Sequence, residues 1–208
     1  MDEFGYNIDD ELTKELADRL MKMKGETRGF NLEHDIIWIL KERGKEGLIK
    51  VEEETRKVGY PIEYEKLKKM GFYPAGLRAI SLLAIKKAFN MDAEGIKNVC
   101  ALHPKVSLVV RLFAKYFYSI PKTMEKASAM WKAYWTEGEL VSVSFDLKEK
   151  RGILRLQGFD LHPLFCCCEE GYFKTVGEMV TGSKEVTCKE TKCTFRGDKY
   201  HEYEITYK

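Results

Sequence analysis

The sequence predicts an α+β protein in which a helical N-terminal part precedes a β-β-α-β-β antiparallel sheet packed on helices. Two observations predict this order. Before Gly138, apolar residues recur three and four residues apart, which is the spacing of one face of a helix. After Gly138, short segments alternate apolar and polar residues around a single helical stretch, as half-buried strands do. The 208 residues are 44% hydrophobic, which is enough to build a substantial core.

The N-terminal part of the chain predicts an array of short helices. We expect them over about residues 9–24, 31–43 and 45–58, with glycine-containing breaks between them. This array precedes the main body of the chain. We therefore expect an N-terminal helical extension over residues 1–70 and an α+β ligand-binding domain over residues 71–208.

The main body begins with a loop at residues 71–74, which is followed by helical patterns. A strong helix is expected over about residues 77–88, and Asp92 caps a shorter one. Further helical patterns lie around residues 106–117 and after Pro121, since proline fits the first turn of a helix. These helices are expected to form the layer on which the sheet packs.

The C-terminal part predicts two pairs of strands around one helix. Residues 141–147 alternate apolar and polar side chains, and a second strand is expected over about residues 153–159. A helix is then expected over residues 163–180, and two more strands over about residues 184–193 and 199–207. Together these segments give the β-β-α-β-β order.

The charge and hydropathy of the chain limit the kinds of partner that we expect. Lys and Arg number 35 and Asp and Glu number 33, a net charge of +2, so we expect no nucleic-acid partner, which would need a basic surplus. No apolar run approaches the roughly 20 residues of a membrane helix, so no membrane span is expected. The opening Met1-Asp2-Glu3 is acidic and no apolar segment of a secretory signal follows, so we expect a cytoplasmic location.

Cysteine and histidine residues near the C-terminus suggest a metal site. Cys168 lies on the apolar stripe of the expected late helix, and His201 shares strand parity with apolar residues, so both are expected to point inward with Cys193. Thiolate and imidazole groups suit a tetrahedral Zn²⁺ site, and Zn²⁺ is the candidate cofactor. The fourth ligand would be Cys166, Cys167 or Cys188. The alternatives are buried thiols with a hydrogen-bonded core histidine, or a redox-sensing group at Cys166 to Cys168.

Aromatic residues recur at helical spacing and indicate a pocket for a small hydrophobic or aromatic molecule. Ligand pockets are mostly apolar with a few polar groups, which this composition would provide. The alternative is that the aromatic stripe is plain core. The candidate ligand-binding residues are Phe113, Phe117, Trp131, Tyr134, Trp135 and Tyr172.

Three short motifs in the C-terminal part add a family resemblance. They are Cys168 with Gly171, Glu190 with Cys193, and Gly197-Asp198 before His201. With the predicted order of elements, these motifs resemble the superfamily of 4-vinyl reductase domains, heme–nitric-oxide-binding sensors and TRAPP vesicle-tethering subunits. The 4-vinyl reductase branch agrees best, although it has a cysteine at the position of His201.

The resemblance implies a homodimer with a pocket between helices and sheet. It does not imply a reductase, because no nucleotide-binding glycine loop is present, and no catalytic residue can be placed from spacing, so an enzyme is not the expected reading. His103 is a candidate axial ligand for heme. However, the Tyr-x-Ser-x-Arg element that clamps the heme propionates in the nitric-oxide sensors is missing, so we do not expect heme.

The sequence therefore predicts a sensory or regulatory domain that binds a small molecule or a metal. One alternative is a scaffold protein of the TRAPP-subunit type whose apolar pocket is structural. The other is an enzyme acting on a tetrapyrrole or aromatic substrate. A closed pocket without titratable groups would favour the scaffold, and a pocket that exposes a Cys or His to its ligand would favour the sensor or the enzyme.

Overall fold

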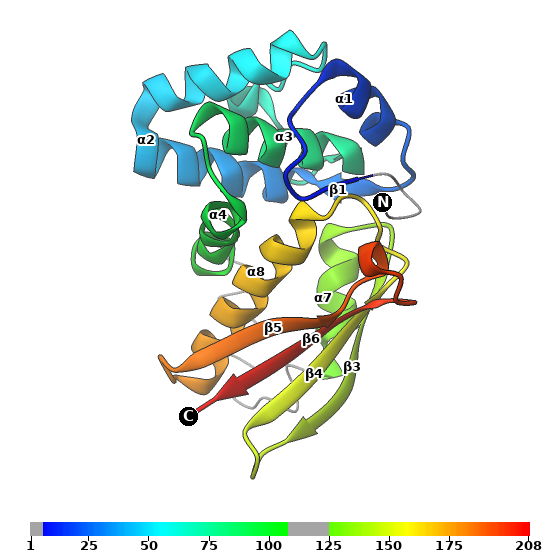
Figure 1. Ribbon diagram of the computed structural model, residues 1–208. Helices are drawn as coiled ribbons and strands as arrows, with labels where there is room; N and C mark the ends of the chain where they lie inside the picture. The colour runs from blue at the N-terminus through cyan, green and yellow to red at the C-terminus, as the bar shows by residue number, and fades with distance from the viewer. Residues whose placement is uncertain (1–5, 108–124) are drawn as a thin grey trace.

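A computed structural model describes residues 6–107 and 125–208 of the chain. Its first helices, α1, α2 and α3, form one layer, and a four-stranded sheet with α4, α7 and α8 forms the rest (Figure 1). The helices are α1 (Lys14–Met21), α2 (Gly29–Lys57), α3 (Ala75–Ala88), α4 (Ala93–Val106), α7 (Ala127–Tyr134) and α8 (Leu164–Thr181), with short 3₁₀ turns η1 (Tyr64–Lys66) and η2 (Thr194–Arg196). The strands are β1 (Glu26–Arg28), β2 (Phe72–Pro74), β3 (Glu139–Asp146), β4 (Arg151–Gln157), β5 (Val186–Lys192) and β6 (His201–Tyr207).

The helical layer differs from the sequence prediction in two places. The expected helices over 31–43 and 45–58 join into α2 across a break at Gly44, whose φ of 66° lies in the left-handed region that glycine tolerates. The expected loop at 71–74 instead contains β2, which pairs antiparallel with β1. Both strands are three residues long, which is too short for an alternating pattern to show in the sequence.

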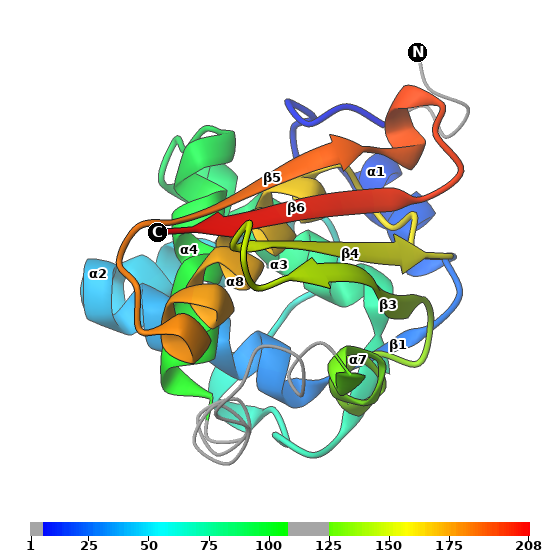
Figure 2. The ribbon, with the colours of Figure 1, turned by 90° about the horizontal axis from the view of Figure 1, so that it is seen from below.

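The four-stranded sheet confirms the predicted β-β-α-β-β order. Its strands are antiparallel and lie in the order β3-β4-β6-β5. All the described helices lie on one face of it (Figure 2). The alternation in β4 explains the two faces: Leu154 and Leu156 are buried toward the helices, whereas Arg155 forms an ion pair with Glu202 at 3.0 Å.

Helix α8 connects the sheet to the remaining helices. It packs against β5 and β6 on one side and against α4 on the other. The approach to α4 is close at Gly171, because a Cβ atom there would lie 2.2 Å from the carbonyl oxygen of Lys97. A disulfide between Cys100 of α4 and Cys168 of α8 joins the two helices covalently. The Gly171 of the family motif is therefore required by helix packing.

Helix α4 begins where the sequence predicted a helix. Asp92 caps α4 as predicted, since its carboxylate accepts a hydrogen bond from the Gly95 amide at 2.8 Å. The helix expected after Pro121 is confirmed in its described part by α7, whereas the pattern expected around 106–117 lies largely outside the described residues. No helix in the described parts of the chain is both long and apolar enough to cross a membrane. The expected boundary near residue 70 stays a prediction.

Candidate functional site

An apolar cavity lies between α8, α7 and the inner face of the sheet. Its volume is about 110 Å³, well above the roughly 10–15 Å³ that one water molecule needs. Helix α8 lines it from Phe165 to Thr181, a length of roughly 24 Å at 1.5 Å per residue. The cavity is therefore elongated along α8.

The aromatic side chains of the cavity wall are packed against one another. The rings of Trp131 and Trp135 stack at 5.8 Å, and Phe159 meets them edge-on at 4.9 and 4.8 Å. The indole N–H of Trp131 donates to the carbonyl of Glu137 at 2.9 Å, which fixes the ring. The structure places four of the predicted ligand-binding residues on the cavity wall: Trp131, Tyr134, Trp135 and Tyr172. The other two, Phe113 and Phe117, lie outside the described residues.

Four helices contribute polar side chains to the cavity wall, and of these four only His103 was singled out from the sequence. These residues are Asn31 of α2, Arg78 of α3, His103 of α4 and Glu169 of α8. Burial raises the pKa of Glu169 to about 8, although Arg78 and His201 oppose the shift. Burial also lowers the pKa of His103. Glu169 and His103 are therefore mostly neutral near pH 7.

Arg78 belongs to a buried group that we call the ion-pair cluster, formed by Asp35, Tyr64, Arg78 and Ser81. The carboxylate of Asp35 accepts a short hydrogen bond from the guanidinium of Arg78 and one from the hydroxyl of Ser81 at 2.6 Å. Tyr64 bonds to Ser81 at 2.6 Å. His103 Nε2 lies 3.5 Å from the second Asp35 oxygen. Since every member is buried, the charge of Arg78 is compensated mainly by Asp35.

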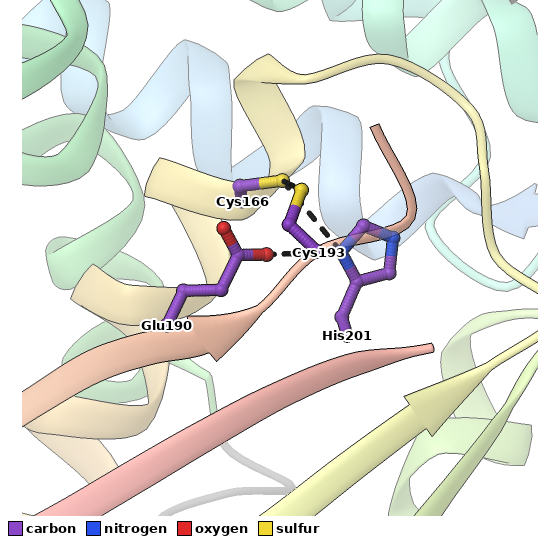
Figure 3. Close-up of side chains that lie close together, drawn as sticks. All are labelled: Cys166, Glu190, Cys193 and His201. Atoms are coloured by element: carbon purple, nitrogen blue, oxygen red, sulfur yellow. Dashed lines mark hydrogen bonds and ion pairs between the residues drawn. The ribbon is translucent and has the colours of Figure 1, made fainter. Parts of the chain in front are cut away.

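A second buried group, the donor cluster, consists of Cys166, Glu190, Cys193 and His201. One ligand atom from each of the four lies within 4.8 Å of all the others. The sulfur atoms of Cys166 and Cys193 are 3.5 Å apart, and His201 Nδ1 lies 3.7 Å from the Cys166 sulfur and 2.9 Å from Glu190 Oε1. Figure 3 shows the four side chains converging from α8, β5, the segment after β5 and β6.

Local structure explains why these side chains meet. The strand parity of β6 turns His201 and Tyr203 toward α8, where Tyr203 packs on Phe173 at 5.1 Å. Cys193 directly follows β5, and its amide donates to the carboxylate of Asp198 at 2.8 Å. Gly197, with φ of 90°, completes the turn into β6. The Gly197-Asp198 motif thus brings Cys193 back beside His201.

The two nitrogens of His201 face different surroundings. Nε2 lies 3.2 Å from the carbonyl oxygen of Phe159 and 3.6 Å from Asp160, so it carries the proton that these acceptors require. The neutral ring then has its lone pair on Nδ1, which faces the donor cluster. Metal-binding histidines commonly have this arrangement, with the other ring nitrogen bonded to a carbonyl or carboxylate.

Without a metal, the members of the donor cluster differ in their pKa shifts. The hydrogen bond from Cys166, helped by His201, lowers the pKa of Cys193 to about 6 against the effect of burial. The same bond and burial raise the pKa of Cys166. Although burial alone would lower it, hydrogen bonds with Asp160, Cys193 and Glu190 raise the pKa of His201 to about 11. Cys193 is therefore a thiolate beside an imidazolium, and a bound cation would replace that proton.

The structure corrects the expected ligand set at Cys168. This residue lies outside the donor cluster, because its sulfur is bonded to Cys100 on α4. Cys166, expected only as a fourth ligand, lies beside Cys193 and His201. Successive residues of a helix point about 100° apart, so Cys166 and Cys168 face different neighbours. Glu190 was absent from the expected ligands, although its spacing before Cys193 was visible in the sequence.

Comparisons with known proteins show the fold. No family model and no curated protein matches the sequence. An H-NOX protein from S. oneidensis in the Fe(II)NO ligation state is similar, with a TM-score of 0.62 and 12% identity over 87% of this chain and 99% of that one. A protein solved to study how porphyrin distortion modulates heme redox potential is similar with a TM-score of 0.58 and 10% identity over 86% and 99% of the two chains.

A trafficking protein particle complex subunit 3 from Naegleria fowleri, covalently bound to palmitic acid, is similar with a TM-score of 0.45 and 12% identity. That likeness covers 56% of this chain and 80% of the other. The H-NOX likeness covers most of the chain, so the chain has the fold of H-NOX domains.

The expectation against heme is corrected by these comparisons. It depended on a missing Tyr-x-Ser-x-Arg element, which is a local motif. The structural neighbours along most of this chain include a protein in an Fe(II)NO ligation state and one studied for its heme redox potential, so the missing element does not justify an expectation against heme. The cavity also has a histidine in its wall, since His103 lines it. A local motif was therefore too narrow a criterion, because a fold can present other side chains to the same cavity.

Proposed function

We propose that this protein is a sensory domain that binds a hydrophobic small molecule in the cavity beside α8, with heme as the first candidate. One observation carries the proposal: the cavity combines aromatic walls with a histidine and charged side chains. That combination favours a ligand-binding site over the purely structural pocket of a scaffold protein. The H-NOX fold supports the same choice.

The cavity residues fit a heme in two respects. The wall is mostly aromatic and aliphatic, as a porphyrin face requires, and His103 supplies an imidazole within it. The Nε2 atom of His103 is buried without a hydrogen bond and lies beside Asp35, a carboxylate that would orient the ring. A bound heme would supply an iron to which a small gaseous ligand binds.

Heme titration followed by absorption spectroscopy tests this proposal. We expect saturable binding at one heme per chain, and loss or displacement of the heme absorption band in His103→Ala. His34→Ala is the matched control, because His34 is buried against the His103 ring at 5.0 Å but does not line the cavity. Equal spectra in all three proteins would contradict the role of His103, and the absence of saturable binding would contradict heme itself.

We also propose that the donor cluster binds a soft divalent metal, with Zn²⁺ as the candidate. Two sulfurs, one imidazole and one carboxylate within 4.8 Å of one another match the ligands and the number that tetrahedral Zn²⁺ takes. Folding gathers the four ligands from separate elements, so metal binding would stabilise the fold. The metal would fasten the start of α8 to the end of the sheet that contains β5 and β6.

Elemental analysis of the purified protein, together with zinc titration of the chelated protein, tests the metal site. We expect one zinc per chain in the unmodified protein and a loss of tight binding in Cys193→Ala. Cys167→Ala is the matched control, since Cys167 is the next residue after Cys166 but is no member of the donor cluster. Zinc retained equally by Cys193→Ala would contradict the assignment.

Two finer expectations remain predictions under this proposal. The homodimer implied by the family resemblance is tested by light scattering at micromolar concentration, where a monomer would count against it. The nearer likeness to the 4-vinyl reductase branch would be supported if His201→Cys, which restores the cysteine of that branch, retained the proposed metal.

A further inference from the structure

We propose that Arg78 and Glu169 form a recognition site for a carboxylate carried by the apolar ligand of the cavity. The inference rests on the proposed function, because it concerns the head group of a molecule whose apolar body fills the cavity. It assigns a role to two buried polar side chains that the aromatic wall does not require. A propionate of a porphyrin and the head of a long-chain acid share this chemistry.

Glu169 is buried in the wall of the cavity. Its side chain lines the cavity and is only 6% exposed, yet within the described residues it has no hydrogen bond and no ion pair. A buried polar group without a partner costs free energy, so its position is informative. Because burial raises its pKa to about 8, the group carries a proton at pH 7 and can donate it in a hydrogen bond.

Arg78 supplies a positive charge near Glu169 and opposes the rise that burial causes in the pKa of that carboxyl group. Within the described residues its guanidinium donates only to Asp35, through one nitrogen, although a guanidinium has five N–H donors. The residue is 2% exposed and lines the cavity. Guanidinium groups match carboxylates in geometry and charge, and hydrogen bonds to an ionised group are the strong ones. The two residues therefore bring donors from α3 and α8 to the wall of one cavity.

The remainder of the cavity suits the body of such a ligand. From Glu169 the lining of α8 continues through Phe173, Val176 and Val180, toward Ile205 and Tyr207 at the end of β6. Beyond Glu169 the lining from α8 is thus mainly apolar. A molecule with an apolar body and a carboxylate at one end satisfies both parts. A ligand without the carboxylate would leave Glu169 without a partner.

Comparing each free acid with its methyl ester tests the head group alone. The probes are metal-free protoporphyrin IX with its dimethyl ester, and palmitic acid with methyl palmitate. Quenching or shift of the Trp131 and Trp135 fluorescence reports binding, since both rings line the cavity. For at least one pair we expect the unmodified protein to bind the acid at least tenfold more tightly than the ester. The pair that shows the preference identifies the source of the carboxylate.

Variants then locate the preference. In Glu169→Leu, which has no donor, the preference for the acid should fall to less than threefold, whereas Glu169→Gln, whose amide can donate, should retain most of it. Val180→Ala is the matched control in the apolar part and should weaken acid and ester to the same extent. Equal binding of acid and ester by the unmodified protein, or an unchanged preference in Glu169→Leu, would overturn the inference alone. If no acid and no ester binds, the proposed function fails together with it.

Discussion

The two buried polar clusters of this protein satisfy their charges in different ways. In the ion-pair cluster, Asp35 accepts hydrogen bonds from Arg78 and Ser81, so an anion and a cation lie side by side. In the donor cluster, all four members are groups that donate electron pairs to a cation. The proton on His201 lies beside the Cys193 thiolate, and the guanidinium of Arg196 lies 3.3 Å from the carboxylate of Glu190. The first cluster pairs its anion with a cation of the protein itself, and the second is arranged for a bound cation.

The difference lies in where the partners come from. Asp35 and Arg78 are on α2 and α3, two helices of the same layer, and their pairing holds that layer together. The donor cluster collects residues from α8, from β5 and the turn after it, and from β6. Removing one partner of a buried ion pair destabilises the fold, whereas gathered soft ligands make folding depend on the metal that they bind.

The largest expected effect is on the ion-pair cluster. Asp35→Ala removes the acceptor of Arg78 and leaves a buried guanidinium without its counter-charge, so the free energy of unfolding should fall by about 3–5 kcal/mol. Chemical denaturation measures the change. Ser81→Ala is the control, because it removes the hydrogen bonds of Ser81 to Asp35 and Tyr64, worth about 1 kcal/mol each, and no charge. A loss below about 1 kcal/mol in Asp35→Ala would show that the charge of Arg78 does not depend on Asp35 for its compensation.

The next effect concerns metal at the donor cluster. With free zinc at about a thousand times its dissociation constant, the folded state should gain about 4 kcal/mol relative to the chelated protein. Thermal or chemical unfolding with and without chelator measures the gain. Cys167→Ala should keep it and Cys193→Ala should lose it. A chelator that leaves the stability of the unmodified protein unchanged would show that the donor cluster is only core.

A somewhat smaller effect is expected at Glu169, whose charge interacts with Arg78 and with His201. Its pKa in the folded protein, about 8, is above the usual 4.5. The protonated side chain therefore contributes fully to the free energy of unfolding below pH 4.5, and this contribution is lost as the pH rises from 4.5 through 8. Relative to Glu169→Gln, the unmodified protein should therefore lose about 3 kcal/mol between pH 4.5 and 7. Denaturation of both proteins across this range measures the difference. A constant difference would mean that Glu169 is partnered by a charge.

The smallest effect on the free energy of unfolding is expected at a helix cap that lies outside both clusters. The Thr13 hydroxyl accepts a hydrogen bond from the Leu16 amide at 3.2 Å and caps α1. Thr13→Ala should lower the free energy of unfolding by about 1 kcal/mol, and Thr13→Ser should restore most of it. If Thr13→Ala lowered the free energy of unfolding as much as Asp35→Ala, the buried ion-pair cluster would be no more important for stability than a single helix cap.

Much of the fold follows from the sequence alone. The switch from helical to alternating spacing near Gly138 predicted the β-β-α-β-β order, because side chains repeat every 3.6 residues in helices and every two in strands. The same parity placed His201 on the face toward α8. The Asp92 cap was also visible, since its carboxylate bonds to an amide only three residues away. These features depend on neighbours along the chain.

Only the tertiary structure decided which side chains meet. Cys166 and Cys168 both lie in the first turns of α8, which is flanked by α4 and by the sheet, and the apolar stripe cannot tell these two surfaces apart. The packing of α8 on α4 turned Cys168 to Cys100 and left Cys166 for the donor cluster. Arg78 and Glu169 reach the cavity from α3 and α8, ninety-one positions apart. Such pairings follow from how the elements pack, which spacing along the chain does not encode.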